Sequence, residues 1–199
     1  MFKQQLETDL SKQFVTSNIL FSRFCLLQET ARQTLAYSDP TYYPLYYHLG
    51  KYLQPKKLLE LGFGLALSSG AFLQGCKTVE DFVAYKRKTE DYYNEALGKK
   101  NLKNVYKNNF SLCYGGLDEL MEKISGRKFD LILVNEEGPV DEYRAELDLV
   151  WDHLNSKGFM IVDHVGSGDT KMIFENFCKI KNKDFILINS RYGTGVIER

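Results

Sequence analysis

From residue 57 to the end of the chain, short apolar segments alternate with longer amphipathic ones. This alternation is typical of a parallel β-sheet with helices on both faces, because each pair of parallel strands is joined by a crossover helix. We therefore expect an α/β protein with a Rossmann-like, doubly wound sheet of seven strands. The expected strands are residues 57–61, 81–86, 104–110, 129–135, 158–164, 184–190 and 193–199, and the expected helices are residues 67–75, 88–100, 117–125, 140–155 and 170–181.

The last two expected strands break this alternation. They lie within "FILINSRYGTGVIER", where only a few residues around Tyr192 and Gly193 separate them. A connection that short has no room for a crossover helix, so the two strands must be antiparallel neighbours. The sequence thus predicts a mostly parallel sheet that ends in a C-terminal antiparallel hairpin.

The expected helix over residues 140–155 carries apolar side chains at helical spacing. A stripe with this period lies on one face of a helix, which we expect to be buried in the core. The stripe includes the single Trp of the chain and consists of Tyr143, Leu147, Val150, Trp151 and Leu154.

The length of 199 residues suits one domain with a sizeable core. We expect a single domain over 1–199, in which a helical N-terminal extension (1–52) precedes the Rossmann-like core (53–199). The extension is expected to begin with helices over about 3–14 and 18–36. The apolar stretch 19–27 suits packing on a partner subunit as well as on the protein's own sheet, so a homo-oligomer is one expectation.

The composition gives no reason to expect nucleic acid or a membrane as a partner. Lys and Arg (26) balance Asp and Glu (26), so the whole chain has no net charge to attract a polyanion. No apolar run approaches the ~20 residues of a membrane-spanning helix. The four cysteines are widely spaced and form no C-x-x-C pair, which favours a reducing, cytoplasmic setting.

A glycine turn follows the first expected strand in "ELGFGLALSS", residues 60–69. Glycine lets the backbone approach a ligand closely, because no Cβ stands in the way. Gly62 and Gly64 match the first two glycines of a dinucleotide fingerprint, but Leu67 stands where the third is expected. This argues against NAD or FAD, and leaves a nucleotide-dependent oxidoreductase as a weak alternative.

The sequence here resembles the class I S-adenosylmethionine-dependent methyltransferases. The resemblance rests on "LLELGFGLALS", "KFDLILVNEE", "LNSKGFMIVDHV" and "RYGTGVI", and is closest to small-molecule O-methyltransferases of the sugar and catechol types. It implies that the backbone of Gly62, Phe63 and Gly64 lies against the methionine moiety of S-adenosylmethionine, with Glu60 near its amino group. A zwitterionic amino acid requires such close approach and a carboxylate for its ammonium.

The resemblance also assigns residues to the nucleoside. Phe110 and Ser111 stand where the family contacts adenine, and Asn135 ends the fourth strand where metal-binding members have Asp. Family members end the second strand with an acid that accepts from both ribose hydroxyls, whereas this chain has Tyr85 and Lys86 there. Glu90 or Asp91 in the following helix is the alternative acceptor. We include Tyr85 and Asn135 among the expected cofactor-binding residues.

Two kinds of catalysis are consistent with these strand ends. Asp163 and Asn135 offer the hard oxygen ligands that Mg²⁺ prefers. Without a metal, His164, Glu136 or Glu137 would take the proton from an acceptor hydroxyl at the carboxyl edge of the sheet. Both alternatives stay open.

The function expected from these features is methyl transfer from S-adenosylmethionine to an oxygen, in preference to a nitrogen, of a small molecule. The alternative is a binding or scaffolding protein that kept this fold but lost catalysis. It is motivated by Tyr85, Lys86 and Asn135, which stand where the family has acids.

Overall fold

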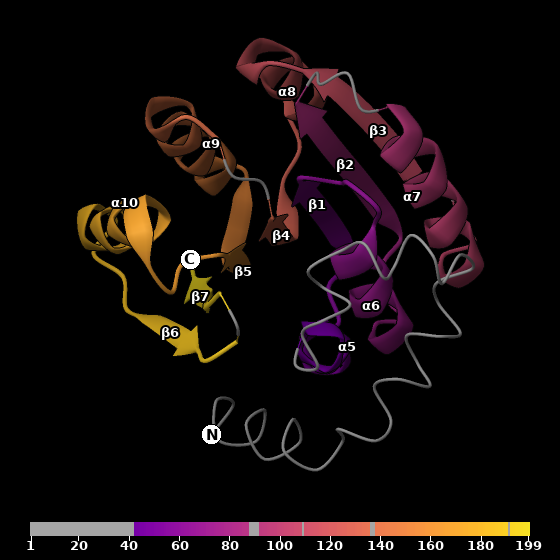
Figure 1. The fold of residues 1–199 in the computed structure, drawn as a ribbon, viewed down its shortest axis with the longest axis horizontal. Helices are drawn as coiled ribbons and strands as arrows, with labels where there is room; N and C mark the ends of the chain where they lie inside the picture. Colours follow the sequence, from indigo (N-terminus) through magenta and orange to yellow (C-terminus); the bar gives the residue numbers. More distant parts are fainter. Residues whose placement is uncertain (1–41, 88–91, 109, 136–137, 191) are drawn as a thin grey trace. The chain divides into compact units, whose positions relative to one another are not determined.

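The computed structural model describes residues 42–87, 92–108, 110–135, 138–190 and 192–199, and not the side chains of 92–95. Seven strands form one sheet in the order β3-β2-β1-β4-β5-β7-β6 (Figure 1). The strands are β1 (Lys57–Leu61), β2 (Asp81–Arg87), β3 (Phe110–Gly115), β4 (Phe129–Val134), β5 (Leu154–Asp163), β6 (Phe185–Ile188) and β7 (Thr194–Glu198). The predicted Rossmann-like sheet is therefore confirmed.

The described helices are α5 (Tyr42–Leu53), α6 (Leu67–Gly75), α7 (Tyr92–Val105), α8 (Leu117–Ile124), α9 (Val140–Asp152) and α10 (Gly168–Ile180). The described residues divide into two compact units. The sheet unit holds all seven strands with α8, α9 and α10, and the helical unit holds α5, α6 and α7. The single domain over 1–199 stays a prediction, and the predicted helices over 3–14 and 18–36 lie outside the described residues.

The C-terminal hairpin is confirmed as well. Strand β7 pairs antiparallel with β6 and also antiparallel with β5, whereas β1 to β5 pair in parallel. The chain crosses from β5 through α10 to the edge strand β6 and then returns between them as β7. The short connection fixes this arrangement, because the five residues between Ile188 and Thr194 leave space for a turn only.

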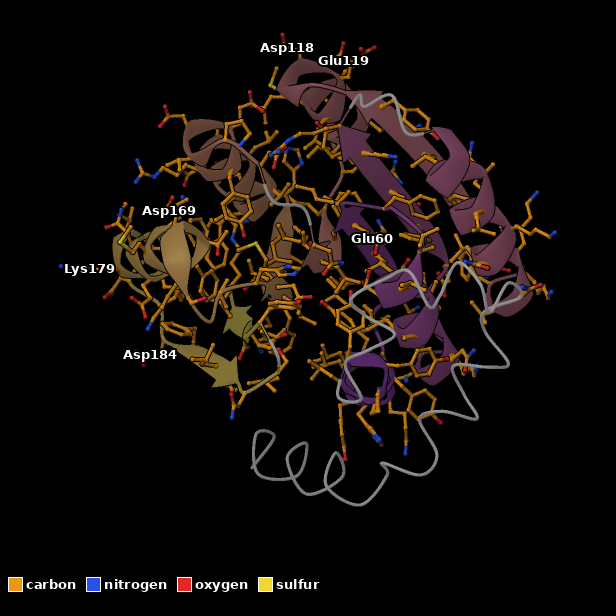
Figure 2. All side chains as sticks on the ribbon, viewed as in Figure 1. Glu60, Asp118, Glu119, Asp169, Lys179 and Asp184 are labelled. Carbon is orange, nitrogen blue, oxygen red and sulfur yellow. The ribbon has the colours of Figure 1, made fainter. Side chains whose placement is uncertain are left out.

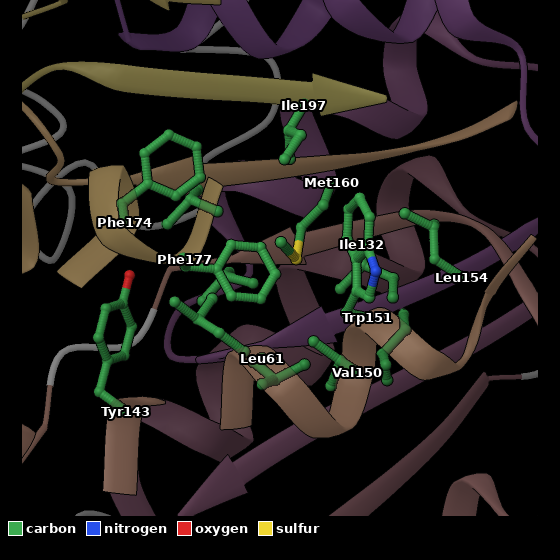
Figure 3. Close-up of a cluster of buried hydrophobic side chains, with 14 of the residues drawn as sticks. Leu61, Ile132, Tyr143, Val150, Trp151, Leu154, Met160, Phe174, Phe177 and Ile197 are labelled. Carbon is green, nitrogen blue, oxygen red and sulfur yellow. The ribbon is translucent and has the colours of Figure 1, made fainter. Parts of the chain in front are cut away.

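The core of the sheet unit lies between one face of the sheet and helices α8, α9 and α10. Alternate strand residues face these helices, among them Leu59 and Leu61 of β1 and Val83 and Tyr85 of β2. The predicted stripe is buried in this core, although its last member, Leu154, begins β5 and does not belong to α9. Trp151 of α9 meets Phe177 of α10 edge to face at 5.5 Å (Figure 3). Because successive side chains of a strand point to opposite faces of the sheet, Leu59 and Leu61 lie on one face and Glu60 lies on the other.

Two strand starts predicted from the sequence are wrong. The fifth strand was expected at 158–164 after a helix over 140–155, but α9 ends at Asp152 and β5 already begins at Leu154. Residues 104–110 were expected as the third strand, but residues 104 and 105 end helix α7, and β3 runs from Phe110 to Gly115. A short apolar run does not distinguish a strand from the end of a helix by its period alone. Phe110 and Ser111 therefore begin β3 instead of following it.

In the helical unit, α5 packs closely on α6 at two glycines. A Cβ at Gly50 would lie 2.1 Å from the Phe72 carbonyl oxygen, and one at Gly75 would lie 2.0 Å from the Tyr47 carbonyl oxygen. Side-chain-free backbone at both positions lets the helices touch. Among the helices that the structure describes, none has the length and apolar character to cross a membrane.

Candidate functional site

The glycine turn follows β1 at the carboxyl edge of the sheet. Gly62 has a φ of 87°, a left-handed conformation that glycine adopts without a steric penalty. The backbone N–H groups of Gly62 and Phe63 both donate to the carbonyl oxygen of Tyr85, at 3.0 and 3.2 Å. The turn is thereby fixed to the end of β2. Gly64, with a φ of 43°, begins the next segment of the helical unit.

Glu60 is a fully buried carboxylate two residues before this turn. Its Oε1 accepts a hydrogen bond from Asn135 Nδ2 at 3.4 Å, and the Asn135 N–H donates to the Leu61 carbonyl oxygen at 2.9 Å. Figure 2 shows the contrast with Asp118, Glu119 and Lys179, which are exposed. A carboxylate away from water needs compensation, which makes Glu60 a suitable partner for a ligand cation.

The side chain of Phe63 is buried against the beginning of β3. Its ring stacks on Phe110 with centroids 5.8 Å apart, and Phe110 in turn packs against Phe82 at 5.9 Å. Phe110 pairs with Phe82 at the amino ends of their strands, whereas Gly115 ends β3 opposite Arg87. The predicted adenine contact of Phe110 and Ser111 assumed that these residues follow the third strand. They instead begin β3, and the contact itself stays a prediction.

Tyr85 is buried in the core of the sheet unit. Its hydroxyl donates to the carbonyl oxygen of Gly115 at 2.9 Å, which ties β2 to the end of β3. The predicted contact of Tyr85 with the cofactor stays a prediction. Strand β2 continues past Tyr85 through Lys86 to Arg87. The resemblance places Tyr85 and Lys86 where the family ends this strand with an acid.

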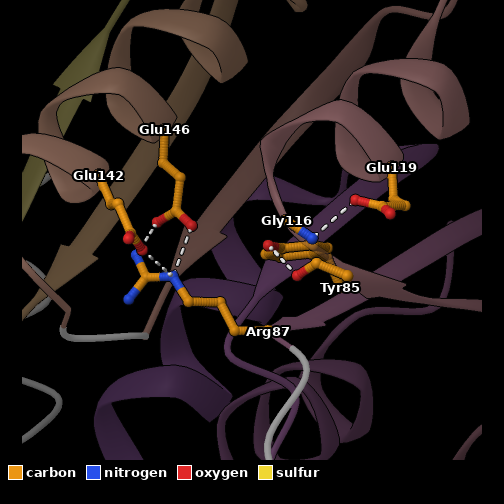
Figure 4. Close-up of polar contacts among 7 residues, drawn as sticks. Tyr85, Arg87, Gly116, Glu119, Glu142 and Glu146 are labelled. Carbon is orange, nitrogen blue, oxygen red and sulfur yellow. Dashed lines mark hydrogen bonds and ion pairs between the residues drawn. The ribbon is translucent and has the colours of Figure 1, made fainter.

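Arg87 forms a buried ion pair that the sequence analysis missed. Its Nη2 lies 2.6 Å from Glu146 Oε2, and its Nε donates to Glu146 Oε1 at 2.9 Å (Figure 4). The Glu146 side chain is 1% exposed, and burial raises the pKa of its carboxyl although Arg87 acts to lower it. The available signal was the spacing of Glu142 and Glu146, which places both on one face of α9.

A cavity of about 470 Å³ lies beside this pair, at the carboxyl ends of β2 and β3. Helices α8 and α9 supply three carboxylates to its lining. The residues that line it are Tyr85, Arg87, Gly115, Gly116, Leu117, Glu119, Glu142 and Glu146.

The end of β5 carries the predicted catalytic histidine. Asp163 is buried, and its Oδ1 accepts from Thr194 Oγ1 and from the His164 N–H, both at 3.0 Å. His164 has a φ of 61°, and its ring packs on Tyr192 with centroids 4.8 Å apart. The roles of His164, Glu136 and Glu137 stay predictions, and the two glutamates lie outside the described residues.

The predicted metal ligands do not form a cluster with other donors in the described part of the chain. No three of its His, Cys, Asp and Glu side chains come together as a metal site would require. Asp163 bonds to Thr194, and Asn135 bonds to Glu60. Asp163 and Asn135 stay predicted metal ligands, and Glu136 and Glu137, one of which would join them, lie outside the described residues.

Comparison with solved structures identifies the fold. The chain is similar to a putative O-methyltransferase from Klebsiella pneumoniae, with a TM-score of 0.70, 13% identity and coverage of 100% of this chain and 99% of that one. It is also similar to an O-methyltransferase from Bacillus cereus in complex with SAH (S-adenosylhomocysteine), with a TM-score of 0.69, 12% identity and coverage of 98% and 100%. No protein-family model and no curated protein sequence matches the chain.

A third similar structure is the SAH-bound methyltransferase PaMTH1 from Podospora anserina. Its TM-score is 0.68 at 16% identity, and the match covers 89% of this chain and 86% of that chain. The protein therefore has the class I S-adenosylmethionine-dependent O-methyltransferase fold. Identities this low establish the fold alone.

Proposed function

We propose that the protein transfers a methyl group from S-adenosylmethionine to an oxygen of a small molecule. The observation that carries this proposal is the buried carboxylate of Glu60 beside the glycine turn at the carboxyl end of β1. Strand β1 lies between β2 and β4, where the order of the strands reverses. Open α/β sheets bind their ligands at this switch point, outside the carboxyl ends of the strands.

The residues at the switch point suit the amino-acid end of this cofactor. Gly62 presents backbone without a Cβ, and Glu60 offers a carboxylate to the ammonium group. Asn135 holds the Glu60 carboxylate from the neighbouring strand end. The bound cofactor supplies an electrophilic methyl group on a positively charged sulfur.

We assign the proton transfer to His164, with Glu136 and Glu137 as the alternative bases. The imidazole would take the proton of the acceptor hydroxyl as its oxygen accepts the methyl group that the bound cofactor would supply. Asp163 accepts from the backbone N–H of His164 at 3.0 Å, and the ring is packed on Tyr192. A general base of this kind contributes about 10²–10⁴-fold to the rate.

The proposed reaction assigns the proton transfer to protein side chains, so no metal ion takes part in it. EDTA should therefore leave the methyl-transfer rate unchanged. A rate that depends strictly on added Mg²⁺ would support the metal alternative, with Asp163 and Asn135 joined by Glu136 or Glu137.

Calorimetric titration with S-adenosylhomocysteine tests the proposal. The wild-type protein should bind it, and Glu60→Gln should weaken the affinity about 10- to 100-fold, because hydrogen bonds to a charged group contribute about 1.5–3 kcal/mol. The control is Glu80→Gln, since the exposed Glu80 pairs with Lys56. If the wild type fails to bind at millimolar concentration, the transferase is wrong and the scaffolding alternative gains support.

The setting and assembly of the protein belong to the same proposal. We propose a reducing, cytoplasmic environment, a small-molecule acceptor and a homo-oligomer formed through the N-terminal segment that includes residues 19–27. Light scattering after size exclusion measures the assembly: removal of that segment should convert the oligomer to a monomer, and a monomeric wild type would contradict the proposal.

A further inference from the structure

Strand β2 lacks the group that a ribose requires. Two adjacent hydroxyls donate most effectively to one carboxylate, because a carboxylate accepts several hydrogen bonds and donates none. The strand ends instead with Tyr85, Lys86 and Arg87. The Tyr85 hydroxyl is engaged with Gly115, and the cationic side chains of Lys86 and Arg87 donate hydrogen bonds but accept none.

The cavity beside β2 lies next to the glycine turn along the backbone. The Tyr85 carbonyl oxygen accepts from Gly62 and Phe63, and Arg87 is two residues farther along the same strand. A ligand whose amino-acid end meets Gly62 and Glu60 therefore has its sugar near the end of β2. The cavity of about 470 Å³ at this strand end has space for polar ligand atoms.

Three carboxylates line the cavity, and two of them are occupied. Glu146 receives two hydrogen bonds from the Arg87 guanidinium, at 2.9 and 2.6 Å. Glu119 Oε2 accepts from the Gly116 N–H at 2.8 Å, which closes the first turn of α8. Both carboxylates therefore serve contacts within the protein.

Glu142 is the third carboxylate and is placed differently. Among the described residues its one ion pair is with Arg87 Nε, at 3.8 Å, which is longer than a hydrogen bond. The side chain is 57% exposed and lies on the same face of α9 as Glu146, one turn earlier (Figure 4). The two hydrogen bonds that Arg87 donates go to Glu146, so the exposed carboxylate of Glu142 keeps its capacity to accept.

We propose that Glu142 of α9 accepts hydrogen bonds from the ribose hydroxyls of the cofactor, in place of an acid at the end of β2. Arg87 is a positioning residue: its guanidinium holds Glu146 and leaves Glu142 beside it at the rim of the cavity. This inference rests on the proposed function. With the ribose contact assigned to Glu142, the cation at the end of β2 is compatible with the carboxylate of Glu60 on β1 in one cofactor site.

Titration of S-adenosylhomocysteine and its 2′,3′-dideoxy analogue into the full chain tests the inference. The wild type should bind the parent ligand about 10- to 100-fold more tightly than the analogue, since hydrogen bonds to a charged group contribute about 1.5–3 kcal/mol. Glu142→Ala should weaken the parent ligand by a similar factor and bind both ligands with nearly equal affinity. The control Asp141→Ala removes an exposed carboxylate of the same helical turn and should discriminate as the wild type does.

The two ligands separate the possible failures. If the wild type binds neither, the proposed function fails and the inference fails with it. If the wild type binds but Glu142→Ala still discriminates between the ligands as strongly, the role of Glu142 alone is wrong. A circular dichroism spectrum and an unfolding curve equal to those of the wild type would show that Glu142→Ala is folded.

Discussion

The carboxyl ends of β1 and β2 are neighbours in one sheet, yet they differ in charge. At β1 a buried carboxylate, Glu60, precedes a glycine turn and takes a hydrogen bond from Asn135. At β2 a cation, Arg87, is neutralised by Glu146, a residue 59 positions away on helix α9. The group at the end of β1 is thus a carboxylate that accepts from an amide, whereas the group at the end of β2 is a guanidinium that donates to a carboxylate of a helix.

The difference shows that the sheet fixes how the two strand ends meet but not which side chains or elements supply the charge at each end. Backbone pairing places Leu61 opposite Tyr85, so the turn after β1 meets the end of β2 whatever the side chains are. The side chains at a strand end are free to differ, because a helix packed over that end, as α9 is over the end of β2, can supply the carboxylate there.

The largest expected effect is at the end of β2. Arg87→Met leaves the buried carboxylate of Glu146 without its cation, and breaking a buried pair in this way costs about 3–5 kcal/mol. Urea unfolding measures the loss. The matched control is Lys171→Met, which removes an exposed pair with Glu175 and should cost no more than about 0.5 kcal/mol. Equal losses in the two variants would show that the Arg87 pair does not stabilise the sheet.

The stability lost in Arg87→Met should depend on pH. Burial raises the pKa of Glu146, so the folded protein binds this proton more tightly than the unfolded chain does. The stability from such a group is fullest below its unfolded pKa and falls as the pH rises through its folded pKa. Without Arg87 that pKa rises further, so the deficit should be smaller at about pH 5 than at about pH 8. A pH-independent deficit would contradict this.

A smaller effect is expected at Gly138, which faces the same pair. A Cβ there would lie 1.5 Å from Arg87 Nη1, so Gly138→Ala must displace the guanidinium. Forced displacement in a packed site costs about 1–3 kcal/mol. In the Arg87→Met background the cost should shrink, since the obstructing group is gone, and a double-mutant cycle of unfolding free energies measures the coupling. If the losses of unfolding free energy from the two substitutions are strictly additive, Arg87 does not contact Gly138.

The smallest change in stability is expected at the end of β1. Gly62→Ala places a Cβ in a left-handed conformation, which costs about 1–2 kcal/mol. The matched control is Gly126→Ala, because Gly126 has a φ of 69° and a Cβ there would meet nothing within 4 Å. Both variants should lose similar stability, but Gly62→Ala alone should lose affinity for S-adenosylhomocysteine in a calorimetric titration. Retained affinity in Gly62→Ala would contradict the proposed approach of backbone to ligand.

Local patterns predicted most of the sheet. Strand 57–61 and helix 67–75 have the bounds expected from the sequence, because an apolar run and a glycine turn define them without help from distant residues. The start of β3 was wrong, since "NVYKNNF" gives no local signal that α7 continues to Val105. The pairing of Arg87 with Glu146 was missed because it joins residues far apart in sequence, and only packing of α9 on the sheet brings them together.

A crystal structure of the protein with S-adenosylhomocysteine tests the central claim most directly. The account predicts the ligand's ammonium about 2.8 Å from the Glu60 carboxylate, its backbone-facing atoms against Gly62, and its ribose hydroxyls at Glu142. Ligand density elsewhere, or the side chain of Phe63 filling the space beside the turn, would contradict it.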